Sequence, residues 1–272
     1  MPRVRSKDGT PIGFDRAGGG PAVILVDGAL CHRGFGPMPK LAPLLAEHFT
    51  MFTYDRRGRG DSGDADRYAV EREVEDLEAL IEEAGGSASM LGISSGAVLA
   101  LDAVNRGLSV ERLAVYEPPF IVDDARAPIA SDYRSRLDEL ISDDRRGDAV
   151  KLFMKQVGIP SMLVAVMPVL PNWSKLKAVA PTLRYDAAIM GDTQAGNPLP
   201  ADRWSSVTAP TMVLGGGKSP AWMQHGVSEL ADLLPNTDHR LLDRQTHQVK
   251  AKVLAPALVE FFAPRGHSAH PT

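Results

Sequence analysis

The sequence has little of what marks a secreted, membrane-bound or metal-binding protein. Its 272 residues include a single cysteine, Cys31, which excludes an internal disulfide, and no pairing of Cys and His has the spacing of a zinc site. No run of about 18 apolar residues occurs, and the N-terminal MPRVRSKDGTP lacks the apolar core of a signal peptide. These absences predict a cytoplasmic protein that holds no metal.

Strong charge of either sign is also missing. The formal net charge is −4, which gives no electrostatic reason to expect nucleic acid as a partner. With 44% hydrophobic and 24% charged residues, the chain can bury a large core as one domain, or as one domain with an insertion. We therefore expect a small-molecule substrate as partner, with no nucleic acid and no membrane, and a homodimer is left open.

Strand and helix patterns alternate along most of the chain. Short apolar runs that end in turn-forming residues predict strands at 21–28 and 49–55, and further strands are predicted at 87–93, 110–117, 209–217 and 238–243. Helical patterns lie between and after them at 37–48, 70–84 and 95–105, then up to residue 234, and at 249–263. This alternation predicts an α/β protein with a mostly parallel sheet that is covered on both sides.

The alternation stops between about residues 122 and 202. This segment is helical in pattern, contains several prolines and four methionines, and shows no convincing strand. It predicts a helical insertion at 121–203 that separates a first core part, 1–120, from a second, 204–264. Residues 265–272 are predicted to be a disordered tail.

The stretch MLGISSGAVLAL contains the pattern G-x-S-x-G, formed by Gly92, Ser94 and Gly96, where a predicted strand meets a predicted helix. A sharp turn at this junction requires small residues on both sides of a strained serine. Ser94 would then project above the sheet at the N-terminus of a helix, which favours developing negative charge. We interpret Ser94 as a nucleophile; the alternative is that Ser94 or Ser95 only caps the helix.

These motifs together resemble the α/β-hydrolase fold family. The resemblance covers about residues 3–263 and rests on VDGAL, YDRRGRGDSG, GISSG, VYEPP and TH, in that order. It implies an eight-stranded, mostly parallel sheet with helices on both faces and a helical cap inserted after the sixth strand. It also implies that a nucleophile, an acid and a histidine follow one another along the chain.

The resemblance assigns the histidine to His247, which lies in the loop before the last helix, whereas His225 and His239 are interpreted as structural or surface residues. Most family members place an acid after the seventh strand, but no Asp or Glu occurs from 211 to 228, and Ser219 or Lys218 stands there. A minority use the end of the sixth strand, which is Glu117 here. Glu117 is therefore the expected acid; the alternatives are that it anchors the following Pro-Pro turn, or that the site is a Ser/His dyad.

A serine nucleophile also needs backbone donors for the oxyanion. The resemblance assigns this role to the N–H groups of Ala29 and Ser95. Related enzymes usually have His-Gly where this chain has Asp27-Gly28. The role of Asp27 stays open, with Arg56, Arg57 or the loop backbone as its possible partners.

Two glycine-rich stretches are similar to nucleotide-binding loops but lack part of each pattern. Gly58, Gly60 and Gly63 have G-x-G-x-x-G spacing, yet loop residues follow and helical periodicity begins only near Tyr68. In GGGKS, the first glycine of a phosphate loop would fall on Met212. We expect no cofactor. Three arginines beside the first stretch, 56, 57 and 59, are expected to pair locally with the aspartates at 55, 61 and 64.

The sequence thus predicts a cofactor-independent serine hydrolase that cleaves an ester, thioester or lactone. A small to medium, partly apolar substrate is expected, because Met162, Met167 and Trp173 of the insertion are candidates to line a lid over the pocket. Two alternatives remain. One is a non-hydrolytic enzyme of the same fold, such as a perhydrolase, acyltransferase or lyase, and the other is a non-catalytic small-molecule-binding protein.

Overall fold

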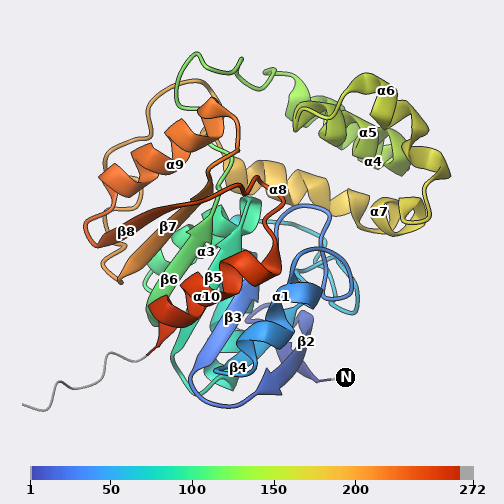
Figure 1. Cartoon of the computed structure of the whole chain (residues 1–272). Helices are drawn as coiled ribbons and strands as arrows, with labels where there is room; N and C mark the ends of the chain where they lie inside the picture. The colour runs from blue at the N-terminus through green and yellow to red at the C-terminus, as the bar shows by residue number, and fades with distance from the viewer. Residues whose placement is uncertain (1, 264–272) are drawn as a thin grey trace, which may run out of the picture.

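The computed structural model describes residues 2–263, which form one eight-stranded sheet with helices on both faces (Figure 1). The strand order is β1-β2-β4-β3-β5-β6-β7-β8; β2 pairs antiparallel with β1 and β4, and all other pairs are parallel. The predicted fold class is confirmed. The strands are β1 (Arg3–Arg5), β2 (Pro11–Gly18), β3 (Ala22–Val26), β4 (Thr50–Tyr54), β5 (Ala88–Ile93), β6 (Val110–Tyr116), β7 (Thr211–Gly216) and β8 (Thr237–Leu242).

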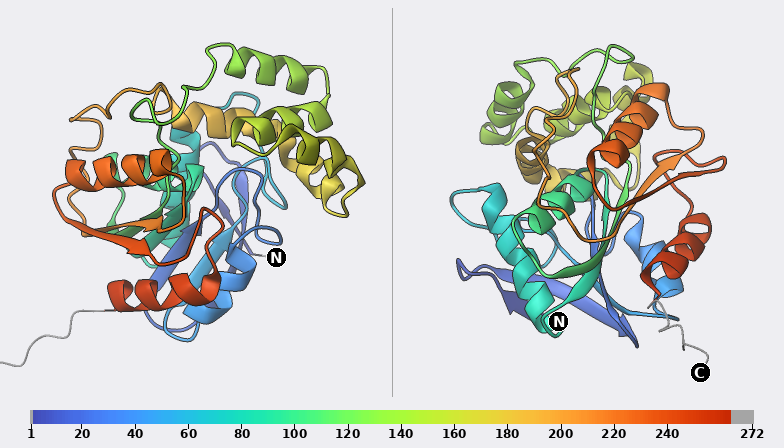
Figure 2. Two further views of the ribbon diagram at one scale, coloured as in Figure 1. Left: turned by 45° about the horizontal axis from the view of Figure 1, so that its top comes forward. Right: turned by 90° about the vertical axis from the view of Figure 1, so that its left-hand side faces the viewer.

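Five helices cover the sheet in two layers. They are α1 (Met38–Leu45), α2 (Val70–Glu83), α3 (Ser95–Asn105), α9 (Ala221–Leu233) and α10 (Ala251–Phe262). Helices α1 and α10 lie together on one face, and α2, α3 and α9 lie on the other (Figures 1 and 2). Each layer buries its own apolar cluster against the sheet, so the core has two halves divided by the strands.

The central strands are apolar on both sides. In β3, Ile24 and Val26 point to the layer of α2 and α3, whereas Val23 and Leu25 point to the layer of α1 and α10. A parallel strand that is buried on both faces is apolar at nearly every position, because successive side chains alternate between the faces. This explains the continuous apolar runs that predicted these strands.

Strands β1 and β2 form a hairpin at the edge of the sheet, where the sequence pattern located no strand. Asp15 and Arg16 of β2 are exposed, so this strand lacks the apolar run that marked the others. Among the described residues, no helix combines the length and the apolarity needed to cross a bilayer.

The chain between β6 and β7 forms short helices joined by loops. It forms α4 (Tyr133–Ser142), α5 (Arg146–Gln156), α6 (Ser161–Val166), η1 (Met167–Val169), α7 (Trp173–Val179), η2 (Ala180–Thr182) and α8 (Leu183–Met190). We call this segment the helical insertion. Its last helix, α8, packs against α3 and passes over the end of the sheet where β5 leads into α3 (Figures 1 and 2). The predicted tail, 265–272, lies outside the described residues.

Candidate functional site

Ser94 occupies a strained turn between β5 and α3. Its backbone has φ 58° and ψ −127°, a conformation that is rare for a residue with a side chain. Gly92 and Gly96 allow this turn, since a Cβ on Gly92 would collide with Gly96 O and Ala97, and a Cβ on Gly96 would collide with Val26 O and Asp27 O. Neither Gly92 nor Gly96 can therefore be replaced by a residue with a side chain unless the backbone shifts.

Capping does not explain the two serines. Ser94 is the N-cap residue of α3, but its side chain makes no capping hydrogen bond. The hydroxyl of Ser95 donates instead to Asp186 Oδ1, at 2.7 Å. The turn thus holds Ser94 with a hydroxyl that the helix does not use.

Glu117 and His247 are brought together. Glu117 follows β6, is fully buried and has a positive φ of 44°. Its Oε2 lies 3.0 Å from His247 Nδ1, and its Oε1 accepts hydrogen bonds from the backbone N–H of Gly216 and from the hydroxyl of Ser219. The carboxylate therefore faces the end of β7 and the histidine loop. Ser219, at the position where the family resemblance leads us to expect an acid, donates instead to Glu117.

The loop that carries His247 is braced from two sides. The hydroxyl of Tyr116, the last residue of β6, donates to Thr246 O at 2.7 Å. The N–H of Lys218 donates to Gln245 O at 2.8 Å. Both contacts fix backbone positions next to His247, so the ring is held by its loop as well as by Glu117.

The loop after β3 runs beside Ser94. A Cβ on Gly28 would lie 2.9 Å from Ser94 Cβ and 3.5 Å from Ser94 Oγ, so only glycine fits there. In the part of the chain that the structure describes, the backbone N–H groups of Ala29 and Ser95 donate to no other group. Two free backbone donors therefore flank the serine, one in this loop and one at the start of α3.

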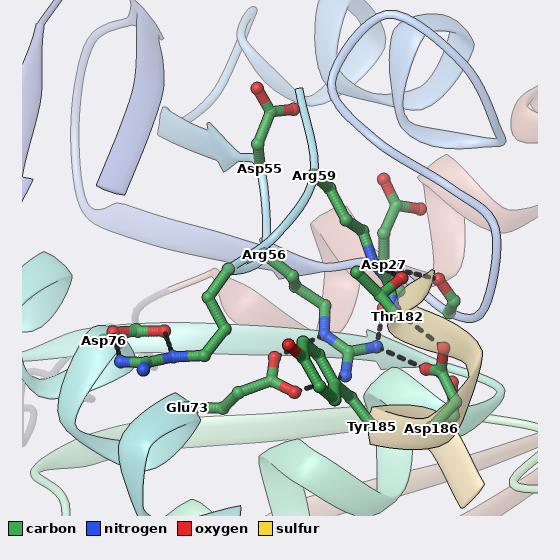
Figure 3. Close-up of polar contacts among 12 residues, drawn as sticks. Asp27, Asp55, Arg56, Arg59, Glu73, Asp76, Thr182, Tyr185 and Asp186 are labelled. Carbon is green, nitrogen blue, oxygen red and sulfur yellow. Dashed lines mark hydrogen bonds and ion pairs between the residues drawn. The ribbon is translucent and has the colours of Figure 1, made fainter. Parts of the chain in front are cut away.

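The three arginines of the YDRRGRG segment are buried, and the partners predicted for them were wrong. Arg56 pairs with Glu73 and Asp186, and Arg59 pairs with Asp186 (Figure 3). Arg57 pairs with Asp76 and Asp8. The side chains extend into the interior toward α2 and α8 instead of along their own loop. The neighbouring Asp55 pairs with Arg33 at 3.0 Å.

Asp27 is buried, and the side-chain partners considered for it are not found. Its Oδ1 has no hydrogen-bond partner among the described residues, and only its backbone oxygen accepts from Arg56, at 3.3 Å. Burial raises the pKa of Asp27 to about 8, although Arg59 and Arg56 act to lower it. Both arginines are already matched by Glu73 and Asp186, so a third carboxylate in this interior stays protonated near neutral pH.

Cys31, four residues further on, is an unsuitable nucleophile. Burial, followed by the proximity of Asp27, raises the pKa of its thiol to about 12. A thiol with such a pKa is almost entirely protonated at neutral pH and reacts slowly. Among the described residues, no group of three or more His, Cys, Asp or Glu side chains is arranged to hold a metal ion.

The three lid candidates are placed differently from one another. Trp173 and Met167 pack against an apolar cluster of the helical insertion that also contacts Ala29 and Leu30 of the loop after β3. Met162 lies on α6 with 81% of its surface exposed and is not part of that cluster. The structure therefore brings Trp173 and Met167, but not Met162, to the apolar cluster beside the loop.

Comparison with known proteins agrees with this architecture. Residues 19–270 match the model of the Alpha/beta hydrolase family. The chain belongs to this family. It shares 52% sequence identity with an alpha/beta hydrolase from Sphaerobacter thermophilus DSM 20745, with a TM-score of 0.89 over 96% of this chain and 100% of that one.

Other structures resemble this alpha/beta hydrolase at 20% identity, which is evidence of the fold alone. One is a thermophilic esterase from Thermogutta terrifontis, with a TM-score of 0.67 over 95% of this chain and 96% of that one. Another is a bromoperoxidase from Bacillus anthracis, with a TM-score of 0.72 over 96% and 98%. A comparison with curated proteins gives no match.

Replacing Gly92 with alanine tests the turn. Because the added methyl group would meet the backbone of Gly96 and Ala97, we expect Gly92→Ala to lower the free energy of unfolding by at least about 3 kcal/mol. Gly19→Ala is the control, since its Cβ would meet nothing within 4 Å; we expect a change below about 0.5 kcal/mol. Urea denaturation measures both, and equal stability of the two variants would contradict the steric argument.

Asp27→Asn tests the buried neutral carboxyl. The unfolded chain releases the Asp27 proton above the ordinary pKa of 3.8, whereas the folded chain keeps it up to about 8. Between these values the wild type should lose stability relative to Asp27→Asn as pH rises, by up to about 1.4 kcal/mol per pH unit. Urea denaturation at several pH values measures the difference, with exposed Asp66→Asn as control. A pH-independent difference would show that Asp27 is ionised in the folded protein.

Proposed function

We propose that this alpha/beta hydrolase is a serine hydrolase that cleaves an ester, thioester or lactone bond through an acyl-enzyme. The observation that carries the proposal is the 3.0 Å hydrogen bond between buried Glu117 and His247 Nδ1. A carboxylate on Nδ1 fixes the tautomer of the imidazole and stabilises its protonated form. Nε2 is then the nitrogen that accepts a proton.

In this proposal Ser94 is the nucleophile. A serine hydroxyl is a weak nucleophile at neutral pH and needs a base. Ser94 Oγ attacks the substrate carbonyl while His247 Nε2 takes its proton, and Glu117 stabilises the resulting imidazolium. His247 then gives the proton to the leaving group, and an activated water molecule releases the acyl group as an acid.

The two backbone donors complete the proposed site. The N–H groups of Ala29 and Ser95 would bind the oxyanion of the tetrahedral intermediate, each contributing about 3 kcal/mol to transition-state stabilisation. That neither group donates elsewhere in the described chain supports this assignment. Apart from the substrate and water, the proposed chemistry uses only side chains and backbone groups of this chain.

The apolar surroundings favour a partly apolar acyl substrate of small to medium size. Ala29 and Leu30 lie against the apolar cluster of the helical insertion, to which Trp173 and Met167 belong. Apolar side chains around a few polar groups are typical of small-molecule sites. The fold does not select among reactions, as an esterase and a bromoperoxidase share it, so the choice of hydrolysis rests on the site residues.

Labelling with a fluorophosphonate tests the nucleophile. We expect the wild type to gain the mass of one phosphonyl group, Ser94→Ala to gain none, and His247→Ala to react at least about 100-fold more slowly. Intact-mass spectrometry at timed intervals measures the rates. An unlabelled wild type would contradict the serine-hydrolase proposal and favour a non-catalytic binding protein.

Glu117→Gln tests the acid. The amide keeps the shape of the side chain but cannot stabilise an imidazolium as a carboxylate does, so kcat/KM for p-nitrophenyl butyrate should fall by about 10²- to 10⁴-fold. The control is Glu111→Gln, at an exposed position on the same strand, β6. If Glu117→Gln retains the wild-type rate, Glu117 has no part in the mechanism.

A further inference from the structure

Asp186 of the helical insertion is a buried carboxylate that contacts the proposed oxyanion donors indirectly. Its Oδ1 accepts from the Ser95 hydroxyl and from Arg56 Nη1, both at 2.7 Å, and its Oδ2 accepts from Arg59 Nη2 at 2.8 Å. Although burial raises the pKa of Asp186, the charges of Arg59 and Arg56 bring it below the ordinary value. The carboxylate is therefore ionised, and both of its oxygens accept hydrogen bonds.

Arg59 links Asp186 to the loop after β3. Its Nη1 donates to Gly28 O at 2.6 Å and to Cys31 O at 3.1 Å, the carbonyls on either side of the segment that contains Ala29. Its Nη2 binds Asp186 (Figure 3). A guanidinium is planar and rigid, so fixing one of its edges fixes the other.

Both proposed donors thus depend on one carboxylate. On one side, Asp186 holds the side chain of Ser95, whose own N–H is a donor. On the other side, Arg59 links Asp186 to the loop that presents the N–H of Ala29. We propose that Asp186 is a positioning residue that sets the separation of the two oxyanion donors; this inference rests on the proposed function.

Asp186 differs from other buried ion-paired carboxylates in what its partners contact. Asp76 is a matched case, because it also receives a buried arginine, with Asp76 Oδ1 and Oδ2 at 2.7 and 2.8 Å from Arg57. Arg57 bonds to Asp8, Ser6 and Arg72 O, and none of these belongs to the loop after β3 or to α3. Breaking either pair should weaken the fold, but only the Asp186 pair should change the oxyanion site.

The experiment compares Asp186→Asn with Asp76→Asn. We expect both variants to lower Tm, while only Asp186→Asn slows phosphonylation of Ser94 by a fluorophosphonate, by about 10- to 100-fold, because the phosphoryl oxygen occupies the same donors. With p-nitrophenyl butyrate, Asp186→Asn should lower kcat by a similar factor and change KM less than about threefold. Asp76→Asn should stay within about twofold of wild type in both assays. Rates are measured below the transition of the less stable variant.

Ser95→Ala provides a second test that leaves both arginines paired. Loss of the hydroxyl bond to Asp186 should slow phosphonylation by about 3- to 10-fold with little change in Tm. Equal labelling rates of wild type, Asp186→Asn and Ser95→Ala would overturn the inference while leaving the serine nucleophile in place. If Asp186→Asn does not fold, the rate of Ser95→Ala decides. A wild type that does not label at all would refute the proposed function, and the inference with it.

Discussion

The arrangement of the site depends on one buried carboxylate at the end of β6. A buried carboxylate is costly unless donors surround it, and Glu117 has three, from Gly216, Ser219 and His247. The end of β7 thus supplies donors to an acid instead of the acid itself. The N–H of Ser94 in turn donates to Tyr116 O, directly before Glu117, so a shift of this strand end would displace both the serine and the histidine.

The buried charges near Ser94 are also paired. Arg56 and Arg59 pair with Glu73 and Asp186, and in the described part of the chain neither arginine forms an ion pair with Asp27. The pKa of Asp27, raised to about 8 by burial, keeps this side chain neutral at the pH of most cells. A neutral Asp27 adds no negative charge beside the loop that carries Ala29, where a second anion would oppose a developing oxyanion.

The sequence predicted the features that local pattern determines. Mostly apolar runs located the central strands, such as β3, because strands buried on both faces have few polar positions, and G-x-S-x-G located the strained turn at Ser94. Glu117 came from the family resemblance, which offers the end of the sixth strand as a second place for the acid when, as here, residues 211–228 contain no Asp or Glu. The role of Ser219 and the contact of Ser95 with Asp186, 91 residues apart, depend on how distant segments dock, and no local pattern records this. The edge strands β1 and β2 were missed because the second half of β2, which includes Asp15 and Arg16, is exposed and breaks the apolar run.

The last helix of the helical insertion, α8, has several polar and aromatic contacts with the core. It is tied to the core by Asp186, by the hydroxyl of Thr182, which accepts from Arg59 at 3.0 Å, and by Tyr185, which donates to Asp64 and stacks on Tyr68 at 3.8 Å. Moving α8 would break these contacts together and disturb the loop that presents Ala29. Helices α4, α5 and α7 pack against that loop through the shared apolar cluster, and Arg134 of α4 donates to Ala187 O and Gly191 O at and just after α8. The last helix is thus a part of the inserted segment that is joined by polar contacts to the core beside Ser94.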